Sequence, residues 1–379
     1  MPKNTRKTVY VFQGGGALGS FQVGGAEALF NAGYSADMVV GISIGGINAA
    51  ILAGNKPEDR INKLKQFWER ITVDINSFGL GLPDFNEAKV TNFLGAQYAL
   101  LAGQPGFFTP KFINPWIMTN GKPEDFAFYD TTPLRKTLEE FIDFDYLNKG
   151  YVRLCLGVTD LETGDFVFFD STKDKITADH VLASAALPPS FPAINIDGRY
   201  YVDGGVYANT PLAKVFDETY SDSSDVLCFM FDLFSAEGVL PHSIDGMLER
   251  IKDIQYSSHS KRSTSLYATT QNLSRAIRFL GSKLPKEIAE TPEVQQVLNL
   301  GSVPNLDLIH IIYHSRRGTE LHSKDYNFNA AAREAHYQQG LAITSQVIKN
   351  GNHQWDNPSK DFSRIYTIDK NNQLVEVDV

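Results

Sequence analysis

The sequence predicts an α/β fold centred on a mostly parallel β-sheet, and three observations near the start of the chain support this prediction. Val9–Phe12 is a short apolar run with β-branched residues, typical of a buried strand. Phe21–Ala32 then has helical periodicity and stops before Gly33. Met38–Ile42 is a second strand, and a helix of small residues follows over Ser43–Ala53. Strands and helices that alternate with short links indicate a parallel sheet covered by helices.

The rest of the chain continues this alternation with one interruption. Residues 80–125 combine many Gly and Pro residues with Phe, Leu and Trp, and we expect an irregular insertion or lid there. Further elements are predicted on both sides of this segment: helices over Arg60–Ile71, Pro133–Phe141, near His180–Ala186, over 245–280 and over Asn329–Lys349, strands over Val152–Val158, Val226–Leu233 and Leu306–Tyr313, a hairpin-like GDFVFFD stretch, and a polar, loop-like C-terminal end.

Composition and charge narrow the class of protein. The chain has 379 residues, of which 42% are hydrophobic and 21% charged, as in an ordinary globular protein. This length favours two structural units over one. The net charge of −9 argues against a nucleic-acid partner, because proteins that bind nucleic acids usually present a basic face.

Cysteine usage and hydropathy predict a location inside the cell. Cys155 and Cys228 lie in apolar runs typical of buried strands, and two cysteines are too few for a Cys-rich zinc site. The N-terminal MPKNTRKT is polar, without an apolar signal region. No apolar run approaches the roughly 18 residues that a membrane span requires. We therefore expect a cytoplasmic protein with reduced thiols and no metal.

Gly41-Ile42-Ser43-Ile44-Gly45 matches the G-x-S-x-G pattern of a nucleophile elbow. In such an elbow a sharp turn between a strand and a helix presents the serine hydroxyl, and the glycines at Gly41 and Gly45 let the two elements approach closely. The helix that begins at Ser43 also favours negative charge at its N-terminal end. The alternative is that Ser43 is an ordinary helix N-cap.

The glycine loop Gly14-Gly15-Gly16 lies between the first predicted strand and the first predicted helix. Consecutive glycines let backbone N–H groups point into an open site, which suits an oxyanion hole or a phosphate cradle. Gly14, Gly16 and Gly19 also match G-x-G-x-x-G. A dinucleotide site would place an acidic residue at the end of the second strand, but that strand leads into Ser43 instead. The oxyanion hole is the preferred interpretation.

Asp203-Gly204-Gly205 has apolar flanks and by itself predicts only a hairpin turn. A serine hydrolase usually has a histidine between its serine and its aspartate. Eight histidines are present, and none has a recognisable catalytic context: His180, His242, His259, His310, His314, His322, His336 and His353. The residues alone do not identify a base for Ser43.

At this point the sequence resembles the patatin-like phospholipases. Four segments match in the right order: QGGGALGSFQ, GISIG, ASAALPPSFP (Ala183 to Pro192) and Asp203-Gly204-Gly205. The resemblance covers residues 6–235, which we expect to form the acyl-hydrolase domain. Residues 236–379 resemble the C-terminal extension of some bacterial members and are expected to be rich in α-helix.

The resemblance implies a three-layer patatin-like fold and a Ser–Asp dyad without histidine. It assigns Ser43 as nucleophile, Asp203 as base, and the amides of Gly14, Gly15 and Gly16 as oxyanion hole. It further implies hydrolysis of fatty-acyl esters of phospholipids, lysophospholipids or neutral lipids. Calcium is not needed in this group, and no cofactor is expected. A desolvated carboxylate close to the hydroxyl is a plausible base.

One departure and two alternatives qualify this assignment. Many members carry a basic residue in the glycine loop where this chain has Leu18, which favours neutral acyl esters over lipid phosphate. An acyltransferase could use the same dyad, but related transacylases usually carry His before the nucleophile, where this chain has Ile42. An inactive lipid-binding or scaffold protein is the other alternative, and the intact Ser43 and Asp203 argue against it.

Residues 80–125 admit two interpretations. NFLGAQYALLAGQPGFFTPKFINPWIM is too apolar for an ordinary surface loop and too rich in Gly and Pro for a regular element. Its aromatic residues, Phe107 and Phe108 among them, could pack in the core. They could instead form a lid or rim that contacts acyl chains and gives peripheral membrane contact.

Overall fold

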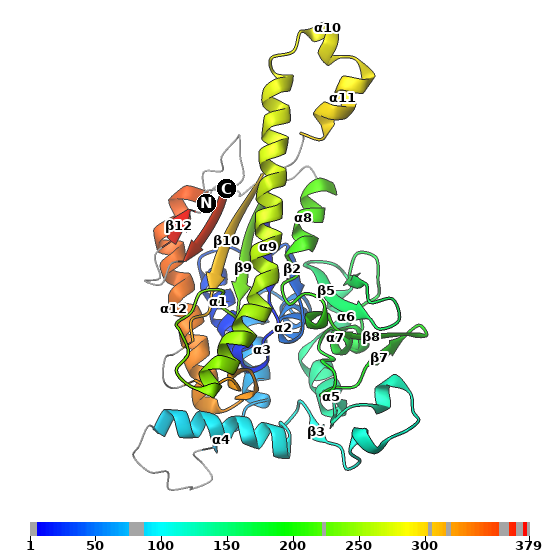
Figure 1. Cartoon of the computed structure of the whole chain (residues 1–379), viewed down its shortest axis with the longest axis vertical. Helices are drawn as coiled ribbons and strands as arrows, with labels where there is room; N and C mark the ends of the chain where they lie inside the picture. Colours follow the sequence, from blue (N-terminus) through cyan, green and yellow to red (C-terminus); the bar gives the residue numbers. More distant parts are fainter. Residues whose placement is uncertain are drawn as a thin grey trace.

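A mostly parallel β-sheet runs through the middle of the molecule (Figure 1), and the predicted α/β class is confirmed. This computed structural model describes residues 6–75, 87–221, 225–301, 305–315, 320–355, 364–368 and 374–376. Within them, the central sheet is formed by β1 (Lys7–Phe12), β2 (Met38–Gly41), β5 (Arg153–Asp160), β6 (Phe166–Asp170), β7 (Ile194–Ile196), β8 (Arg199–Asp203), β9 (Val226–Asp232), β10 (Leu306–Ile312), β11 (Arg364–Ile368) and β12 (Leu374–Glu376).

The strand order is β12-β11-β10-β9-β1-β2-β5-β8-β7, and β6 also pairs with β5. The strands from β11 to β5 are parallel to their neighbours in this order, whereas β12, β6, β8 and β7 pair in the antiparallel sense. A small separate sheet is made by β3 (Thr109–Pro110) and β4 (Tyr129–Asp130). Strand β1 lies at the centre, so the loops that follow β1, β2 and β9 meet at one edge of the sheet.

Helices cover both faces of the sheet. They are α1 (Ser20–Asn31), α2 (Ile44–Ala53), α3 (Arg60–Arg70), α4 (Glu87–Ala102), α5 (Thr132–Phe141), α6 (Phe144–Leu147), α7 (Ala178–Ser184), α8 (Leu212–Ser221), α9 (Ile244–Gly281), α10 (Lys286–Ala289), α11 (Pro292–Asn299) and α12 (Ala330–Trp355). Short 3-10 helices are η1 (Gly16–Gly19), η3 (Pro115–Ile117), η4 (Pro123–Asp125), η5 (Gly204–Val206) and η6 (Lys324–Tyr326). No helix in these described ranges has both the length and the apolar character needed to cross a membrane.

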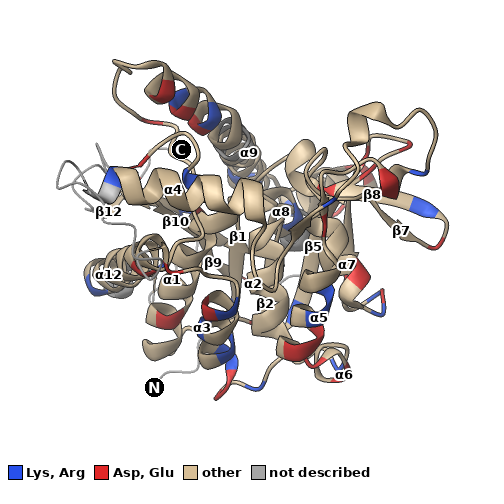
Figure 2. Cartoon of the chain, turned by 90° about the horizontal axis from the view of Figure 1, so that it is seen from below, with Lys and Arg blue, Asp and Glu red and all other residues tan. Residues whose placement is uncertain are grey.

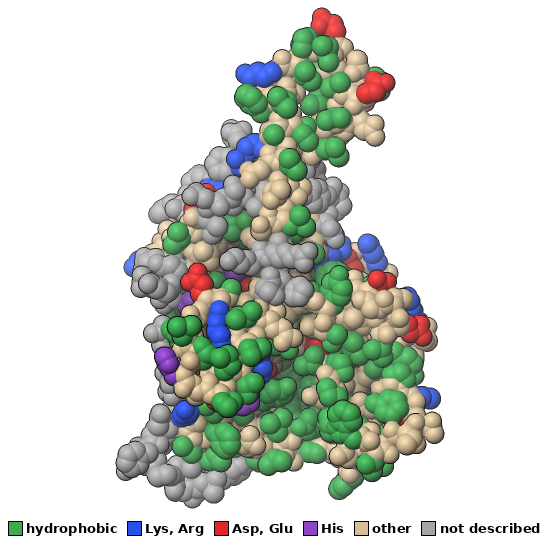
Figure 3. All heavy atoms as spheres, in the orientation of Figure 1, with side chains coloured by type: hydrophobic (Ala, Val, Ile, Leu, Met, Phe, Trp, Pro, Cys, Tyr) green, Lys and Arg blue, Asp and Glu red, His purple; other side chains and the backbone are tan. Residues whose placement is uncertain are grey.

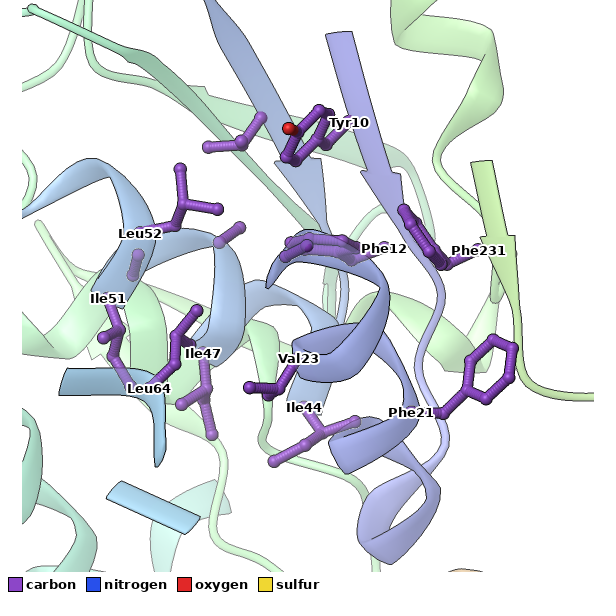
Figure 4. Close-up of a cluster of buried hydrophobic side chains, with 14 of the residues drawn as sticks. Tyr10, Phe12, Phe21, Val23, Ile44, Ile47, Ile51, Leu52, Leu64 and Phe231 are labelled. Carbon is purple, nitrogen blue, oxygen red and sulfur yellow. The ribbon is translucent and has the colours of Figure 1, made fainter. Parts of the chain in front are cut away.

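Alternation along the strands produces two cores, because successive side chains of a strand point to opposite faces. Tyr10 and Phe12 of β1 join the cluster packed against α1, α2, α3 and α12, part of which Figure 4 shows. Val9 and Val11 point the other way, into a cluster that contains Phe216 of α8 and Tyr267 of α9. The Phe216 and Tyr267 rings stack with their centroids 4.1 Å apart. The central strands are thus buried on both sides, as their continuous apolar sequences predict.

Two predictions about secondary structure were wrong. The irregular segment expected over 80–125 contains the 16-residue helix α4, while residues 80–86 lie outside the described part of the chain. Gly95, which suggested a break, lies inside this helix. A side chain does not fit at this position, because a Cβ there would overlap the Asn327 side chain. The C-terminal end, expected to be loop-like, contributes β11 and β12 to the main sheet.

Candidate active site

Ser43 lies at the turn between β2 and α2, as the elbow pattern predicts. It is the N-cap residue of α2 and has φ 56° and ψ −131°. A non-glycine residue with positive φ is strained, and such strain is typical of functional sites. A Cβ on Gly41 would overlap the carbonyl oxygen of Gly45, and one on Gly45 would overlap that of Phe12. Both glycines are therefore required for the close approach of strand, helix and glycine loop.

The segment between Ala183 and Pro192 is hydrogen-bonded to the backbone of both residues of the predicted dyad. The backbone N–H of Ser43 donates to the carbonyl of Ser184 at 2.8 Å, and that of Asp203 donates to the carbonyl of Ala186 at 3.0 Å. The Ser184 hydroxyl in turn donates to the carbonyl of Gly157 on β5 at 2.8 Å. This third matching segment thus places Ser43 and Asp203 beside each other.

Asp203 is a fully buried carboxylate at the end of β8. Its Oδ1 accepts the Gly205 N–H at 2.7 Å, while its Oδ2 accepts no hydrogen bond of normal geometry from the described residues. Burial raises the pKa of Asp203 to about 7, and the Gly205 amide and the Ser43 hydroxyl partly oppose that rise. A carboxylate with a pKa near neutrality is a better base than an ordinary aspartate.

In the glycine loop, the three amides differ in their hydrogen bonds. The Gly14 N–H donates to the carbonyl of Asn209 at 3.2 Å, and the Asn209 side chain donates back to the carbonyl of Gly14 at 2.9 Å. Gly15 and Gly16, by contrast, have no acceptor for their N–H groups among the described residues. Of the three amides predicted to form an oxyanion hole, the Gly14 amide therefore already has an acceptor, whereas those of Gly15 and Gly16 could bind another one.

Buried amide side chains brace this loop from behind. Gln13 accepts the N–H groups of Leu233 and Phe234 after β9, at 2.5 and 3.2 Å, and donates to the Thr210 hydroxyl at 2.9 Å. Its carbonyl accepts the Gln22 side chain of α1 at 2.7 Å. The loop is therefore fixed to the sheet and to α1 before any substrate arrives, which is the preorganisation that oxyanion stabilisation requires.

Ser43, Asp203 and the glycine loop all line one pocket, whose cavity volume is about 80 Å³. Most of the other lining side chains are apolar: Ile44, Phe107, Phe108, Ala185, Leu187, Phe191, Phe234 and Phe328. Among the described residues, no lysine or arginine lines the pocket. Phe107 and Phe108 are buried and belong to both the core and the pocket wall, so these two side chains are not an exposed lid.

The C-terminal extension contributes part of this wall, which the sequence patterns did not reveal. Tyr256 comes from α9, Asp325 and Tyr326 from η6, and Phe328 from the chain that follows. A Cβ on Gly16, whose φ is +53°, would overlap the carbonyl oxygen of Asp325. None of these residues stands in a local motif, and only their position in the fold brings them to Ser43.

The histidines whose side chains the structure describes lie away from this pocket, and none lines it. His310 bonds to Asp232 at 2.7 Å and His336 to Glu320 at 3.1 Å, both as structural pairs. The side chains of His259 and His353 fall outside the described set. Cys155 and Cys228 are buried and form no disulfide, and the described residues contain no group arranged to hold a metal ion.

A parallel sheet whose second strand turns through a strained serine into a helix is the architecture of α/β hydrolytic enzymes with a nucleophile elbow. The family model described as "Patatin-like phospholipase" matches residues 10–216, more than half of the chain. The chain therefore belongs to the patatin-like phospholipase family. A second model, described as "Patatin phospholipase", matches residues 254–361, within the C-terminal extension. Family membership supports lipid hydrolase activity and confirms the resemblance seen in the sequence.

Two solved structures are similar at low sequence identity. VipD from Legionella pneumophila is 16% identical with a TM-score of 0.39, and the match covers 91% of this chain and 67% of VipD. A chain in the structure of full-length SpcU with full-length ExoU, from the type III secretion system of Pseudomonas aeruginosa, is 17% identical with a TM-score of 0.29, covering 77% of this chain and 60% of that one. No curated protein matches the chain.

Proposed function

We propose that the protein is a serine acyl-hydrolase that cleaves fatty-acyl esters of lipids, with Ser43 as nucleophile and Asp203 as its base. One observation carries the proposal: a strained serine and a fully buried carboxylate open into the same apolar pocket, whose described walls contain no histidine. Family membership sets the class of reaction, and the pocket supplies the residues.

In the first half of the reaction, the Ser43 oxygen attacks the carbonyl carbon of the ester and its proton passes to Asp203. The negative charge that develops on the carbonyl oxygen would be held by the N–H groups of Gly15 and Gly16, which have no acceptor among the described residues. When the intermediate collapses, the bond to the alcohol oxygen breaks and the alcohol leaves with the proton from Asp203. The acyl group stays on Ser43.

In the second half, water attacks the acyl-enzyme while Asp203 takes one of its protons. Collapse of the second intermediate returns that proton to the Ser43 oxygen and releases the fatty acid. A single carboxylate serves both halves because each half takes one proton and gives it back.

The lining of the pocket favours substrates recognised through their acyl chain. Its aromatic and aliphatic walls suit an alkyl chain, and no cationic side chain among the described lining residues could bind a phosphate. Leu18, at the position where many relatives carry a basic residue, is completely buried. We therefore propose neutral acyl esters as the better substrates within the lipid class.

The test compares Ser43→Ala and Asp203→Asn with wild type on a soluble p-nitrophenyl ester. Each should lose about 10⁴-fold in kcat or more, since nucleophile and base act as one unit. Ser282→Ala, an exposed serine beyond α9, is the matched control and should keep full activity. A fluorophosphonate probe should label the Ser43 peptide alone. Near-normal turnover by folded Ser43→Ala would show that another group is the nucleophile.

A further inference from the structure

The segment that follows β3 exposes several large apolar side chains next to one another. Phe112 is fully exposed, Trp116 is 79% exposed and Ile117 is 74% exposed, and Ile113 points largely into solvent as well. Exposed apolar residues are normal when scattered singly, but a group of them on one short segment marks an interaction site. We name residues 112–117 the apolar loop.

The apolar loop begins where the wall of the active-site pocket ends. Phe107 and Phe108 line the pocket, and β3 leads from them to Phe112. Four residues span at most about 14 Å, so Phe112 lies within that distance of the pocket wall. In Figure 1 this segment and α4 lie together at the lower end of the molecule, and in Figure 3 hydrophobic side chains gather over that part of the surface.

The apolar loop and the residues on either side of it carry almost no charge, and this indicates the kind of surface that the loop binds. From Val90 to Gly121 the only charged residue is Lys111, whereas 21% of the whole chain is charged. The Lys111 ammonium donates to the carbonyls of Glu124 and Asp125 at 3.2 and 3.4 Å, so it turns back onto its own loop. Figure 2, viewed from the α4 end, shows the body of α4 free of charged residues. A partner protein would find few charged groups on this stretch with which to form the polar rim that protein interfaces usually have.

We propose that the apolar loop docks the protein onto a lipid surface whose head groups carry no net charge, with Phe112 and Trp116 entering the boundary between head groups and acyl chains. The proposal rests on the proposed function, since it delivers a lipid acyl ester directly from the bilayer to the pocket beside Ser43. Tryptophan is favoured at such boundaries, and phenylalanine is common on the apolar face of segments that lie in them. With a net charge of −9 the protein is repelled on average by anionic lipid, so burial of apolar surface is the expected source of the attraction.

The chain carries its own reporter for this docking. Of its three tryptophans, Trp68 and Trp355 are buried and only Trp116 is exposed. The measurement uses the Ser43→Ala variant, which should not hydrolyse the lipid. Addition of phosphatidylcholine vesicles should shift its tryptophan emission to shorter wavelength. The same vesicles should carry the protein upward in a flotation gradient. Both effects should change less than twofold between low and high salt.

The decisive variant is Phe112→Ser with Trp116→Ser, which should lower vesicle binding at least tenfold. Trp116→Phe should still bind, since it keeps an aromatic side chain. Phe279→Ser with Leu280→Ser removes two other exposed apolar residues, 62% and 63% exposed, at the C-terminal end of α9 and should leave binding unchanged. Hydrolysis of a soluble ester should be normal in the Phe112/Trp116 variant, so loss of docking and failure of the proposed function are separate outcomes.

Three results would overturn the proposal. The first is vesicle binding by the Phe112/Trp116 double variant equal to that of its parent. The second is binding that appears only with anionic phosphatidylglycerol and disappears in salt, which would indicate electrostatic docking. The third is a wild-type protein that sediments as a dimer and does not bind vesicles, combined with a double variant that sediments as a monomer. That result would assign the apolar loop to a second copy of the chain.

Discussion

In the proposed mechanism Asp203 acts as the base, although a carboxylate is intrinsically a weak one, and its burial would strengthen it for this role. Complete burial removes the water that would otherwise stabilise its charge, and only the Gly205 amide bonds to it with normal geometry among the described residues. The result is a pKa of about 7 in place of an ordinary value near 4. At neutral pH such a group is partly ionised and binds a proton strongly enough to accept one from a serine.

This pKa predicts the pH dependence of the enzyme. Asp203 must be ionised to accept the Ser43 proton, so kcat/KM should rise with pH and level off above an apparent pKa of about 7. The measurement is a pH–rate profile for a soluble ester with an uncharged leaving group. A profile that is flat from pH 5 to 9 would exclude Asp203 as the base.

The same pKa predicts an effect on stability with a defined sign. Because the folded pKa lies above the unfolded one, ionisation of Asp203 disfavours the folded state, and its cost grows as pH rises from about 4 to 7. Asp203→Asn removes that charge, so this variant should melt at a higher temperature than wild type at pH 8. At pH 4 the difference should nearly vanish. The reverse order at pH 8 would show that the carboxylate stabilises the fold.

At the residue scale, the sequence predicted candidate groups that lie in local motifs, and it missed the pocket residues that only the fold brings to them. Ser43 has a pattern of five residues around it, and Asp203 was recognised only by the order of four family segments. Asn209, which holds Gly14 through two hydrogen bonds, and Tyr256 on α9 have no local pattern. The use of the Gly14 amide by Asn209 could not be predicted either, because it depends on a contact between residues 195 positions apart.

The element that most directly controls the site is η6 with its flanking residues. The buried Lys324 ammonium lies 3.1 Å from Glu249 and 2.9 Å from Asp253, both on α9. The next residue, Asp325, pairs with Lys252 of α9 at 2.7 Å and places its carbonyl against Gly16. The ion pairs between η6 and α9 therefore hold one wall of the pocket and press it against the glycine loop.

Breaking the buried pair should affect both stability and activity. Lys324→Met leaves the buried carboxylate of Asp253 and the half-buried one of Glu249 without their cation and should lower the free energy of unfolding by about 3 kcal/mol. It should also lower kcat/KM, because η6 no longer supports Gly16. Thermal melting and ester hydrolysis measure the two effects.

Two further variants test the cause. Lys324→Met combined with Glu249→Gln and Asp253→Asn removes all three charges and should recover most of the stability. Lys283→Met changes an exposed lysine beyond α9 and should change neither property. If Lys324→Met melts like wild type, η6 is held by its other contacts and the ion pairs are incidental.

At the element scale, long periodic segments were predictable and short or glycine-rich ones were not. The helices α9 and α12 and the strands β9 and β10 lie close to the ranges that the sequence predicts for them. α4 was missed because Gly95 is there for a close contact with Asn327 and not for a break. β11 and β12 were missed because each is short and is stabilised by pairing, β11 with β10 and β12 with β11.

At the scale of the whole molecule, residues on both sides of position 235 build one sheet. β10 pairs with β9, and buried Asp307 on β10 accepts hydrogen bonds from Arg6 at the N-terminal end and from Arg364 on β11, at 2.5 and 2.6 Å. Helices α1 and α12 touch backbone to backbone, since a Cβ on Gly340 would overlap the carbonyl of Phe21. The division into residues 6–235 and 236–379 stays a prediction about domains, and the structure gives it a direct test.

Two deletions distinguish an extension that completes the fold from one that is merely attached. A chain that ends at residue 235 exposes the edge of β9 and the surface of α1 that α12 covers, and it lacks Tyr256 and η6. It should therefore aggregate or remain unfolded, with no cooperative melting and no ester hydrolysis.

In contrast, residues 275–299 form the end of α9 with α10 and α11, and Figure 1 shows this part projecting beyond the sheet. The Ser274 hydroxyl donates to the Leu300 carbonyl at 3.2 Å, so a short glycine linker can join the two ends.

The chain that lacks residues 275–299 should melt close to wild type and hydrolyse a soluble ester at the wild-type rate. Its core clusters and pocket contain no residue from the deleted part. Circular dichroism melting, gel filtration and ester hydrolysis on both deletions provide the comparison. An active, folded 1–235 fragment would establish the first segment as an independent domain. It would also mean that η6 and Tyr256 are dispensable for catalysis, because the 1–235 fragment lacks both.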